Sequence, residues 1–341
     1  MTSLIFLRNI ILSNFTSLAF PYKLTFAITY KCNSRCKICQ IWRKKPKSEL
    51  RFVEIEKFFK INNFFNWIDL TGGEPFLRND LVKICSIIIA SCPSLYLLHI
   101  PTNGILTEKI VKKTKKIIKL KPCRFIISIA MDGPSKVHDK LRGIKGNWDQ
   151  AVETFKELKK IRTKGFEIYF GMTLSGKNYN LIEETYQSLK KEIPDFKRSD
   201  LHFNIAHHSS FYDNLEVNLG LTTKISQKLK EFLRKKEKKL SGIWFLESRY
   251  QKLIPKYLKT HASPLPCQAL SASVFIDPEG NIYPCTMWNK KIGSLTDFGF
   301  DLKEVWQQAR VMNLREKIKE RQCLGCWTPC EAYQAILGNL I

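Results

Sequence analysis

Three cysteines near the start of the chain, Cys32, Cys36 and Cys39, have the spacing Cys-x3-Cys-x2-Cys. They follow an apolar run at residues 24–30 whose β-branched and aromatic residues predict a strand. A loop that leaves a strand can bend three thiolates around one inorganic centre. A [4Fe–4S] cluster usually has four cysteine ligands, so a set of three leaves one iron free to bind a small molecule. The alternatives are a zinc knuckle without its fourth ligand and a chance spacing.

A second segment with chemical potential is Gly72-Gly73-Glu74-Pro75, which ends a short apolar run at residues 68–71. Glycine has no Cβ, so the backbone of Gly72 and Gly73 can approach a ligand closely. Pro75 ends strand pairing, and Glu74 at the carboxyl end of the strand can accept a hydrogen bond from an ammonium group. Alone the tetrapeptide is more often a turn. Its distance of 35 residues from Cys39 makes the pair of motifs distinctive.

Together the two segments resemble the radical S-adenosylmethionine (radical SAM) superfamily. The resemblance implies a [4Fe–4S] cluster whose open iron chelates the amino and carboxylate groups of SAM, with the ligands Cys32, Cys36 and Cys39. The segment that contacts the SAM amino group is then Gly72, Gly73 and Glu74. The family often has an aromatic residue just before the third cysteine, where this chain has Ile38. An isoleucine can still pack against the edge of the adenine.

The chain between residues 24 and 209 alternates short apolar runs with longer segments of helical periodicity. The predicted strands are residues 24–30, 67–71, 95–101, 125–131, 166–174 and 201–206. The predicted helices are residues 52–64, 80–90, 107–120, 148–163 and 181–191. This alternation predicts an α/β fold with a parallel sheet, an open and partial (β/α)6 barrel of the TIM type. Ligands then bind at the carboxyl ends of the strands, where both motifs fall.

Four more polar residues fall at the same predicted face. By the same resemblance, Ser128 and Asp132 at the end of the fourth strand are candidates for the SAM ribose region. Arg142, which follows in the family-like segment 138–143, is a candidate partner of the SAM carboxylate or of a substrate anion. Thr173 ends the fifth strand, where related enzymes often contact the nucleoside.

The last quarter of the chain holds a second cysteine set, Cys267, Cys285, Cys323, Cys326 and Cys330. Two β-rich runs flank the turn at residues 278–281 and predict a hairpin that carries Cys285. Zinc bound by four cysteines is one explanation. The region also resembles the SPASM type of auxiliary-cluster domain, or its shortened twitch form. That resemblance implies a small α+β domain with one auxiliary [4Fe–4S] cluster, with Cys267, Cys285, Cys323 and Cys326 as the best ligands. Cys330 is spare or replaces Cys326.

These patterns predict four parts: an apolar segment at 1–23, the barrel at 24–209, a helical connector at 210–263 and the auxiliary-cluster domain at 264–341. Polar residues interrupt the first segment, so it is a poor signal peptide and a poor membrane span. A helix packed on the barrel is expected there, with a helix lying on a membrane surface as the alternative. The connector carries a predicted helix at 223–240. His207 and His208 receive no role.

The charge of the chain is strongly positive, with 56 Lys and Arg against 31 Asp and Glu in 341 residues. Such a surplus attracts nucleic acid, an anionic membrane surface or an acidic substrate, unless it is only a solvated lysine-rich surface. The eleven cysteines are too clustered, in too long a chain, for a secreted disulfide scaffold. Reduced thiols predict a cytoplasmic location, with the inner membrane surface as a second choice.

The resemblance implies an enzyme that cleaves SAM reductively and uses the 5′-deoxyadenosyl radical to abstract hydrogen from a substrate. A peptide or protein side chain and a lipid or isoprenoid are the leading substrate classes, followed by tRNA, a nucleoside or a sugar. A one-electron reductant of the flavodoxin or ferredoxin type is the expected partner. The competing function is a non-catalytic iron–sulfur or zinc protein that binds nucleic acid, for which Gly72-Gly73-Glu74-Pro75 has no use.

Overall fold

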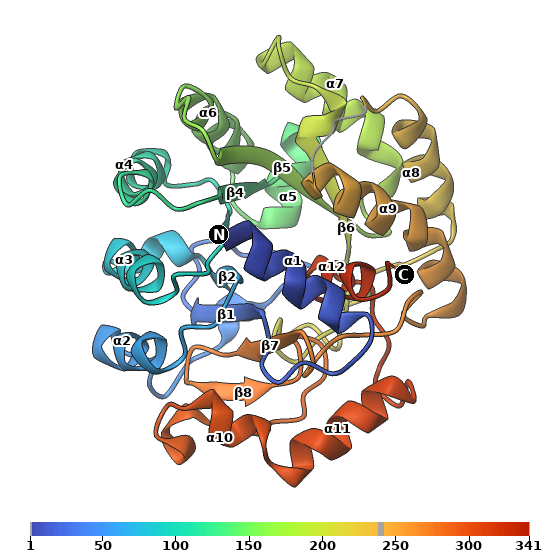
Figure 1. Cartoon of the computed structure of the whole chain (residues 1–341). Coiled ribbons are helices and arrows are strands. Elements are labelled where there is room, and N and C mark those ends of the chain that lie inside the picture. Colours follow the sequence, from blue (N-terminus) through green and yellow to red (C-terminus); the bar gives the residue numbers. More distant parts are fainter. Residues whose placement is uncertain (1, 238–241, 341) are drawn as a thin grey trace.

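The computed structural model describes residues 2–237 and 242–340, and its strands form one nine-stranded sheet in the order β6-β5-β4-β3-β2-β1-β7-β8-β9 (Figure 1). The parallel strands are β1 (Lys23–Thr29), β2 (Trp67–Gly72), β3 (Leu97–Thr102), β4 (Phe125–Ala130), β5 (Phe166–Leu174) and β6 (Leu201–Ile205). The six predicted strands and the α/β fold class are therefore confirmed, with strand ends within two residues of the prediction.

The crossover helices cover the outer side of the parallel strands (Figure 1). They are α2 (Phe52–Ile61), α3 (Leu81–Ser91), α4 (Thr107–Ile118), α6 (Asn147–Lys159) and α7 (Ile182–Glu192). The short helix α5 (Ser135–Arg142) packs on α6, and its end is bonded to the cysteine loop. Two predicted helix ends are wrong. α2 stops three residues early because the Asn62 side chain donates to Phe58 O at 2.8 Å and Phe300 O at 2.7 Å. α6 ends at Lys159 instead of residue 163, ahead of Gly165 with its positive φ of 83°.

Helix α5 was not predicted. It lies directly before Gly143, whose left-handed backbone forms the C-cap, and directly after Pro134 at the N-cap. A proline at the start and a glycine just past the end are the usual signals of a short helix. α5 matters for the site because it carries Arg142 at its last position.

The two faces of the parallel sheet differ in chemistry. Apolar residues such as Phe26 pack outward against α2, where its ring lies 5.9 Å from that of Phe58. The inward positions are polar in several strands, because the register pairs Thr25 with Asp69 and Asp69 with His99. Residues that share a register position on neighbouring strands point to the same face. The inside of the partial barrel is therefore lined by polar groups from successive strands.

The connector contains two helices, α8 (Lys224–Arg234) and α9 (Gly242–Thr260). The predicted helix at 223–240 ends early, at Arg234, and its last three residues lie outside the described part of the chain. α9 was not predicted, although it is the longest described helix and contains Pro255. It packs against β6 and against α12 (Pro329–Leu337), so it helps to close the barrel between β6 and the carboxyl-terminal region.

The predicted hairpin is present as β7 (Ser273–Ile276) and β8 (Asn281–Tyr283), followed by β9 (Gly293–Ser294), α10 (Leu302–Trp306) and α11 (Ala309–Lys319). β7 pairs in parallel with β1, so the carboxyl-terminal region extends the barrel sheet instead of forming a sheet of its own. His207, which follows β6, also contacts the carboxyl-terminal region, since Trp327 N donates to its Nε2 at 3.0 Å.

The apolar segment at the start forms α1 (Thr2–Ser13), which packs on the barrel as predicted. Phe6 contacts the rings of Tyr22 and Tyr96 at 5.5 and 5.4 Å, and Asn9 donates to Asn66 at 2.7 Å. These partners lie just before β1, β2 and β3, so α1 covers the amino ends of these strands (Figure 1). Among the described residues, no helix is long and apolar enough to cross a membrane.

Candidate functional site

One cavity of about 360 Å³ runs inside the barrel from the carboxyl ends of the parallel strands to Trp67 and Leu97 near their amino ends. Nearly all of the predicted motif residues line it, namely Cys32, Cys36, Cys39, Gly72, Gly73, Ser128, Asp132, Arg142 and Thr173. The exception is Glu74, which is not among the lining residues. Residues that are up to 141 positions apart in the sequence therefore meet in one place, because they lie on the strands of one parallel sheet or in the segments that follow them.

The cysteine loop is fixed to the end of α5 by its backbone. Arg35 N donates to Arg142 O and Lys37 N donates to Leu141 O, both at 2.9 Å. Gly143 allows this close approach, since a Cβ at that position would lie 2.4 Å from Arg35 O. The loop that carries the three thiols is thus held against the end of α5 by main-chain hydrogen bonds.

Two of the three sulfur atoms in this loop accept hydrogen bonds. Ser34 N donates to Cys32 Sγ at 3.4 Å, and Arg142 Nη1 donates to Cys36 Sγ at 3.4 Å. Hydrogen bonds to ligand sulfurs are among the features that tune iron–sulfur clusters. Burial raises the pKa of Cys32 to about 11 and that of Cys39 to about 12. The positive charge of a bound metal centre is what would keep such thiols deprotonated.

Gly72 and Gly73 are required because the backbone at the end of β2 packs closely against the end of β1. A Cβ on Gly72 would lie 2.2 Å from Thr29 O, and one on Gly73 would lie 2.3 Å from Lys31 O. Gly73 N also donates to Thr29 O at 2.8 Å. The two glycines therefore bring β2 against the start of the cysteine loop, and their backbone still faces the cavity.

The Glu74 carboxylate is fully buried and has three donors. Asn103 N donates to Oε2 at 2.7 Å, while Thr102 Oγ1 and Phe76 N donate to Oε1 at 3.0 and 3.1 Å. Burial raises the pKa of Glu74 to about 7, although these hydrogen bonds act in the opposite direction. The side chain thus ties the end of β2 to the end of β3. A contact between this carboxylate and the SAM amino group stays a prediction.

Arg142 and Asp132 form a buried ion pair, with Nε and Oδ2 separated by 2.9 Å. Burial alone would lower the pKa of Arg142, but Asp132 and the neighbouring cysteines raise it above its ordinary value. Thr173 N donates to the other Asp132 oxygen at 2.9 Å. This pair therefore connects the cysteine loop to the ends of β4 and β5. The predicted ribose and carboxylate contacts of these residues remain predictions.

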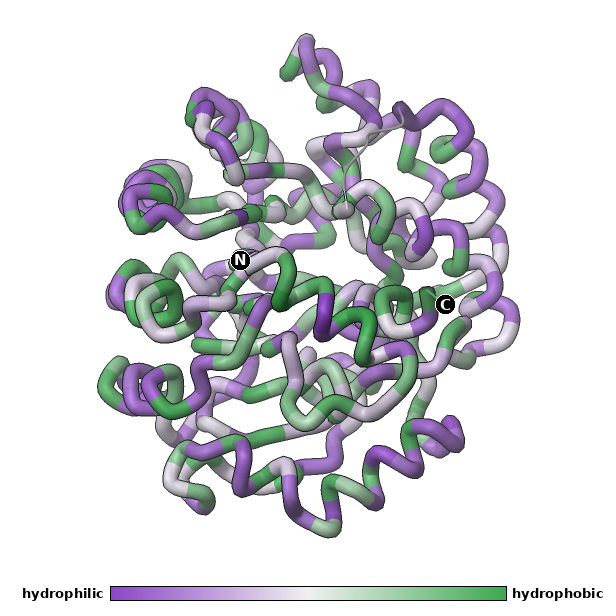
Figure 2. Tube along the Cα trace, viewed as in Figure 1, coloured by the Kyte–Doolittle hydropathy of each residue, from purple (hydrophilic) through white to green (hydrophobic). Residues whose placement is uncertain are grey.

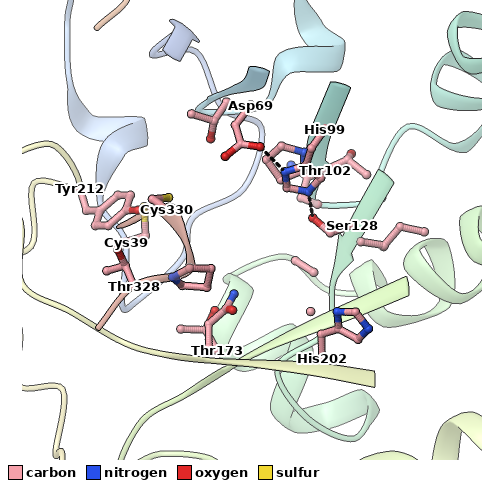
Figure 3. Close-up of a pocket in the computed structure, with 18 of the residues that line it drawn as sticks. Cys39, Asp69, His99, Thr102, Ser128, Thr173, His202, Tyr212, Thr328 and Cys330 are labelled. Atoms are coloured by element: carbon pink, nitrogen blue, oxygen red, sulfur yellow. Dashed lines mark hydrogen bonds and ion pairs between the residues drawn. The ribbon is translucent and has the colours of Figure 1, made fainter. Parts of the chain in front are cut away.

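The inner end of the cavity holds an imidazole–carboxylate pair that the sequence analysis missed (Figure 3). His99 Nδ1 lies 3.2 Å from Asp69 Oδ1, and His99 Nε2 lies 2.8 Å from Ser128 Oγ. Burial alone would raise the pKa of Asp69, but the Lys23 ammonium, 3.1 Å away, and hydrogen bonds hold it well below its usual range. Asp69 is therefore a carboxylate at neutral pH.

A second pair of the same kind faces this cavity from β6 and α9. His202 Nδ1 lies 3.2 Å from Glu247 Oε1, and the Tyr333 hydroxyl donates to the same oxygen. The His202 ring stacks on Tyr169 with 3.8 Å between centroids. The only signal in the sequence was a single polar residue within each apolar strand, as in Leu-His-Phe at residues 201–203. Such single residues form no local motif.

Four of the carboxyl-terminal cysteines line a second, smaller cavity, namely Cys267, Cys285, Cys323 and Cys326. Cys330 is not among its lining residues and lines the main cavity instead (Figure 3). Ala269 N and Trp288 N donate to the sulfurs of Cys267 and Cys285 at 3.5 and 3.3 Å. Burial raises the pKa of Cys326 to about 12. The grouping matches the four ligands that the sequence analysis preferred.

Both cysteine sets surround a space instead of converging on a point. In the described ranges, no three His, Cys, Asp or Glu side chains are grouped so that they could hold a metal ion.

Comparisons with known proteins agree with this geometry. The model of the radical SAM superfamily matches residues 26–189, and the model of the SPASM iron–sulfur cluster-binding domain matches residues 267–327. The chain therefore belongs to the radical SAM superfamily and carries an SPASM-type domain. Membership implies a [4Fe–4S] cluster and SAM in the radical SAM domain and auxiliary iron–sulfur binding in the SPASM-type domain.

Two curated relatives span most of this chain. The antilisterial bacteriocin subtilosin biosynthesis protein AlbA of Bacillus subtilis is 25% identical over 80% of this chain and 56% of its own length. The mycofactocin maturase MftC of Mycolicibacterium smegmatis is 23% identical over 94% of this chain and 78% of its own length. This chain thus spans little more than half the length of AlbA.

Solved structures share the fold. anSMEcpe with bound AdoMet superposes with a TM-score of 0.63 at 14% identity, covering 94% of this chain and 97% of that one. Streptococcus suis SuiB bound to the precursor peptide SuiA gives a TM-score of 0.61 at 14% identity, covering 95% and 76%. At these identities the similarity establishes the fold alone.

The placement of Cys330 leads to a test of the auxiliary ligands. We expect anaerobically reconstituted wild-type protein to hold about eight irons, and Cys326→Ala to lose about four of them. Cys330→Ala is expected to keep all of them, because its sulfur faces the other cavity. Iron and sulfide assays with Mössbauer spectra measure this, with the exposed Cys123→Ala as the control. Equal iron loss in Cys330→Ala and Cys326→Ala would show that Cys330 is a ligand.

Proposed function

We propose that this chain is a radical SAM enzyme that cleaves SAM reductively. The observation that carries the proposal is that Cys32, Cys36, Cys39 and the Gly72–Gly73 backbone line one cavity with Arg142. When bound, the cluster and SAM supply a 5′-deoxyadenosyl radical that removes hydrogen from an unactivated C–H bond. In this proposal the protein binds the cofactors, orients the target carbon and excludes water, since a reactive radical would otherwise be quenched.

Except for Glu74, which is not among the lining residues, the residues proposed to contact SAM line the cavity. The segment Gly72–Glu74 contacts the amino group, and Arg142 contacts the carboxylate or a substrate anion. Ser128, Asp132 and Thr173 contact the ribose or the rest of the nucleoside. Asp132 has one oxygen near Arg142 and the other bonded to Thr173 N, so its position is fixed before SAM arrives. A fixed acceptor loses little conformational entropy when the ligand binds.

We infer that the substrate is a peptide or protein side chain. AlbA and MftC are described as a bacteriocin biosynthesis protein and a maturase, and SuiB was solved with a precursor peptide.

We propose that the auxiliary cluster transfers electrons or positions the substrate. Its four proposed ligands leave no open iron for substrate, since four cysteines complete a [4Fe–4S] site. Cys330 and Thr328 lie in the main cavity, only a few residues after Cys326 in the second one. The segment between them is a short covalent connection from the proposed auxiliary cluster to the space for the substrate.

Cluster-dependent SAM cleavage is the direct test of this function. We expect reduced, reconstituted protein to form 5′-deoxyadenosine from SAM, and Cys36→Ala to fall to the level of a protein-free reaction. Cys36 accepts the Arg142 hydrogen bond and lines the cavity, so its loss removes a cluster ligand. Chromatography of 5′-deoxyadenosine under anaerobic conditions measures this. Cys123→Ala is the matched control, and unchanged cleavage by Cys36→Ala would contradict the proposal.

We further propose that an acidic flavodoxin or ferredoxin docks on the cysteine loop. Six cations in and beside this loop are exposed, namely Lys31, Arg35, Lys37, Arg43, Lys45 and Lys47. Before Glu49 the chain has no acidic residue at all. A dense positive surface beside the electron-accepting site raises the association rate of an acidic partner by about 10–1,000-fold at low salt.

Charge-reversal variants test whether the reductant docks on the cysteine loop or is attracted only by the positive charge of the whole protein. We expect the triple variant Lys31→Glu, Lys37→Glu, Lys45→Glu to be reduced by flavodoxin hydroquinone at least about tenfold more slowly at low salt. The triple variant Lys112→Glu, Lys116→Glu, Lys119→Glu makes the same charge change on the exposed side of α4 and should differ little. Stopped-flow absorbance measures the rates, with dithionite as the reductant that needs no docking. Equal slowing in both triples would contradict a specific surface.

A cytoplasmic location is also part of the proposal, because both clusters need reduced thiols. If the protein binds the inner membrane surface, α1 is the helix that would hold it there, because α1 exposes several apolar side chains.

A further inference from the structure

The exposed apolar side chains of this protein gather on α1. Twelve large apolar side chains are exposed in the described part of the chain, and six of them lie within residues 4–15. These six are Leu4, Ile5, Leu7, Ile11, Leu12 and Phe15. A seventh, Leu340, lies beside them, since its N–H donates to Asn14 Oδ1 at 2.7 Å. Figure 2 shows α1 as a mostly apolar helix across the front of the molecule.

Both sides of α1 are apolar. Its inner side buries Phe6 and Ile10 against the barrel, while Leu4 and Phe15 on the outer side are 68% and 69% exposed. A helix on the surface of a globular protein normally turns polar residues outward. Single exposed apolar residues are common, but a contiguous group usually marks an interaction site. The outer side of α1 therefore has the character of an interaction surface.

The charge around this helix restricts what can cover it. Arg8 is the only charged residue of α1 and is exposed on the same side, one turn after Leu4 and just before Ile11. α1 has no acidic residue, and the net charge of the whole chain is +25. An anionic surface is attracted to such a molecule, and each basic residue near an anionic bilayer contributes about 1 kcal/mol.

The patch is too small to hold a second copy of the chain. A helix of 12 residues is about 18 Å long and about 10 Å wide. A stable protein–protein interface buries about 800 Å² on each partner, several times the area of such a strip. A bilayer has no such requirement, because a helix lying in its interface gains from each apolar side chain that enters the acyl region.

We propose that α1 docks this protein on an anionic lipid bilayer, with Leu4, Leu7, Ile11 and Phe15 in the acyl boundary. Arg8 then lies at the level of the phosphate groups, where its guanidinium can pair with them. Phe6 and Ile10 keep the opposite side of the helix on the barrel, so the helix binds the membrane without leaving the protein.

Docking by α1 fixes the direction in which the proposed active site faces. α1 contacts Tyr22, Asn66 and Tyr96, which precede β1, β2 and β3. The cysteine loop lies at the carboxyl ends of the same strands, and the cavity runs from there to Trp67 and Leu97, the first residues of β2 and β3. A docked molecule therefore has its cysteine loop on the side away from the bilayer and the inner end of its cavity on the side of α1.

Flotation with lipid vesicles tests this proposal on the full-length, reconstituted protein. We expect wild type to float with vesicles of phosphatidylcholine and phosphatidylglycerol at about 150 mM salt, where weak non-specific charge binding fades. The triple variant Leu4→Gln, Ile11→Gln, Phe15→Gln should lose at least about tenfold in partitioning, because three side chains no longer enter the acyl region. The triple variant Val53→Gln, Leu215→Gln, Met312→Gln changes exposed apolar residues elsewhere and should bind like wild type.

Each opposite outcome overturns the proposal. Wild type that stays with the soluble fraction, or equal loss of binding in both triple variants, would rule out α1 as the docking helix. A dimer in sedimentation velocity that the α1 triple variant converts to a monomer would show that a second copy covers the patch. 5′-Deoxyadenosine formation, measured in solution on the same preparations, tests the proposed SAM cleavage separately from membrane binding.

Discussion

The geometry of the proposed active site depends on one buried cation, Arg142. Its guanidinium contacts Asp132 through Nε and Cys36 Sγ through Nη1, while its carbonyl accepts from Arg35 N. A buried charge is expensive to desolvate, and it is tolerated only where partners satisfy it. Here those partners are the cysteine loop on one side and the end of β4 on the other. The same residue therefore gives the loop its position and the thiols a nearby positive charge.

The continuous sheet explains how two cysteine sets at opposite ends of the sequence come together. β7 pairs with β1 in parallel, so the carboxyl-terminal region is aligned with the barrel by main-chain hydrogen bonds. The buried Lys23 on β1 strengthens this alignment, because its ammonium contacts Asp69 on β2 and Gln334 on α12. α12 then presents Cys330 to the main cavity just after Cys326 in the second one. The separation between the two proposed clusters is set by this junction.

The sequence was sufficient for the features that are local. The six strands have clear apolar runs, and the motifs at Cys32–Cys39 and Gly72–Pro75 are short and contiguous, so the fold class and the place of these motifs at the carboxyl ends of the strands were predictable. The pairs Asp69–His99 and His202–Glu247 were not, because their members are 30 and 45 residues apart and meet only through strand register and the packing of α9. Glu74 shows another limit: its position was predicted, but two of its three donors, Thr102 and Asn103, depend on where β3 ends.

The two ends of the barrel differ in what they expose. At the amino ends of the strands, α1 exposes hydrocarbon that is stable only when it is covered. At the carboxyl ends, the cysteine loop exposes cations such as Lys31 and Lys37. The cavity connects the two ends, since its lining runs from Cys32 and Cys36 to Trp67 and Leu97. A molecule docked through α1 therefore keeps its amino-terminal end on the apolar phase and its cysteine loop in the aqueous phase, where an acidic electron donor can approach it.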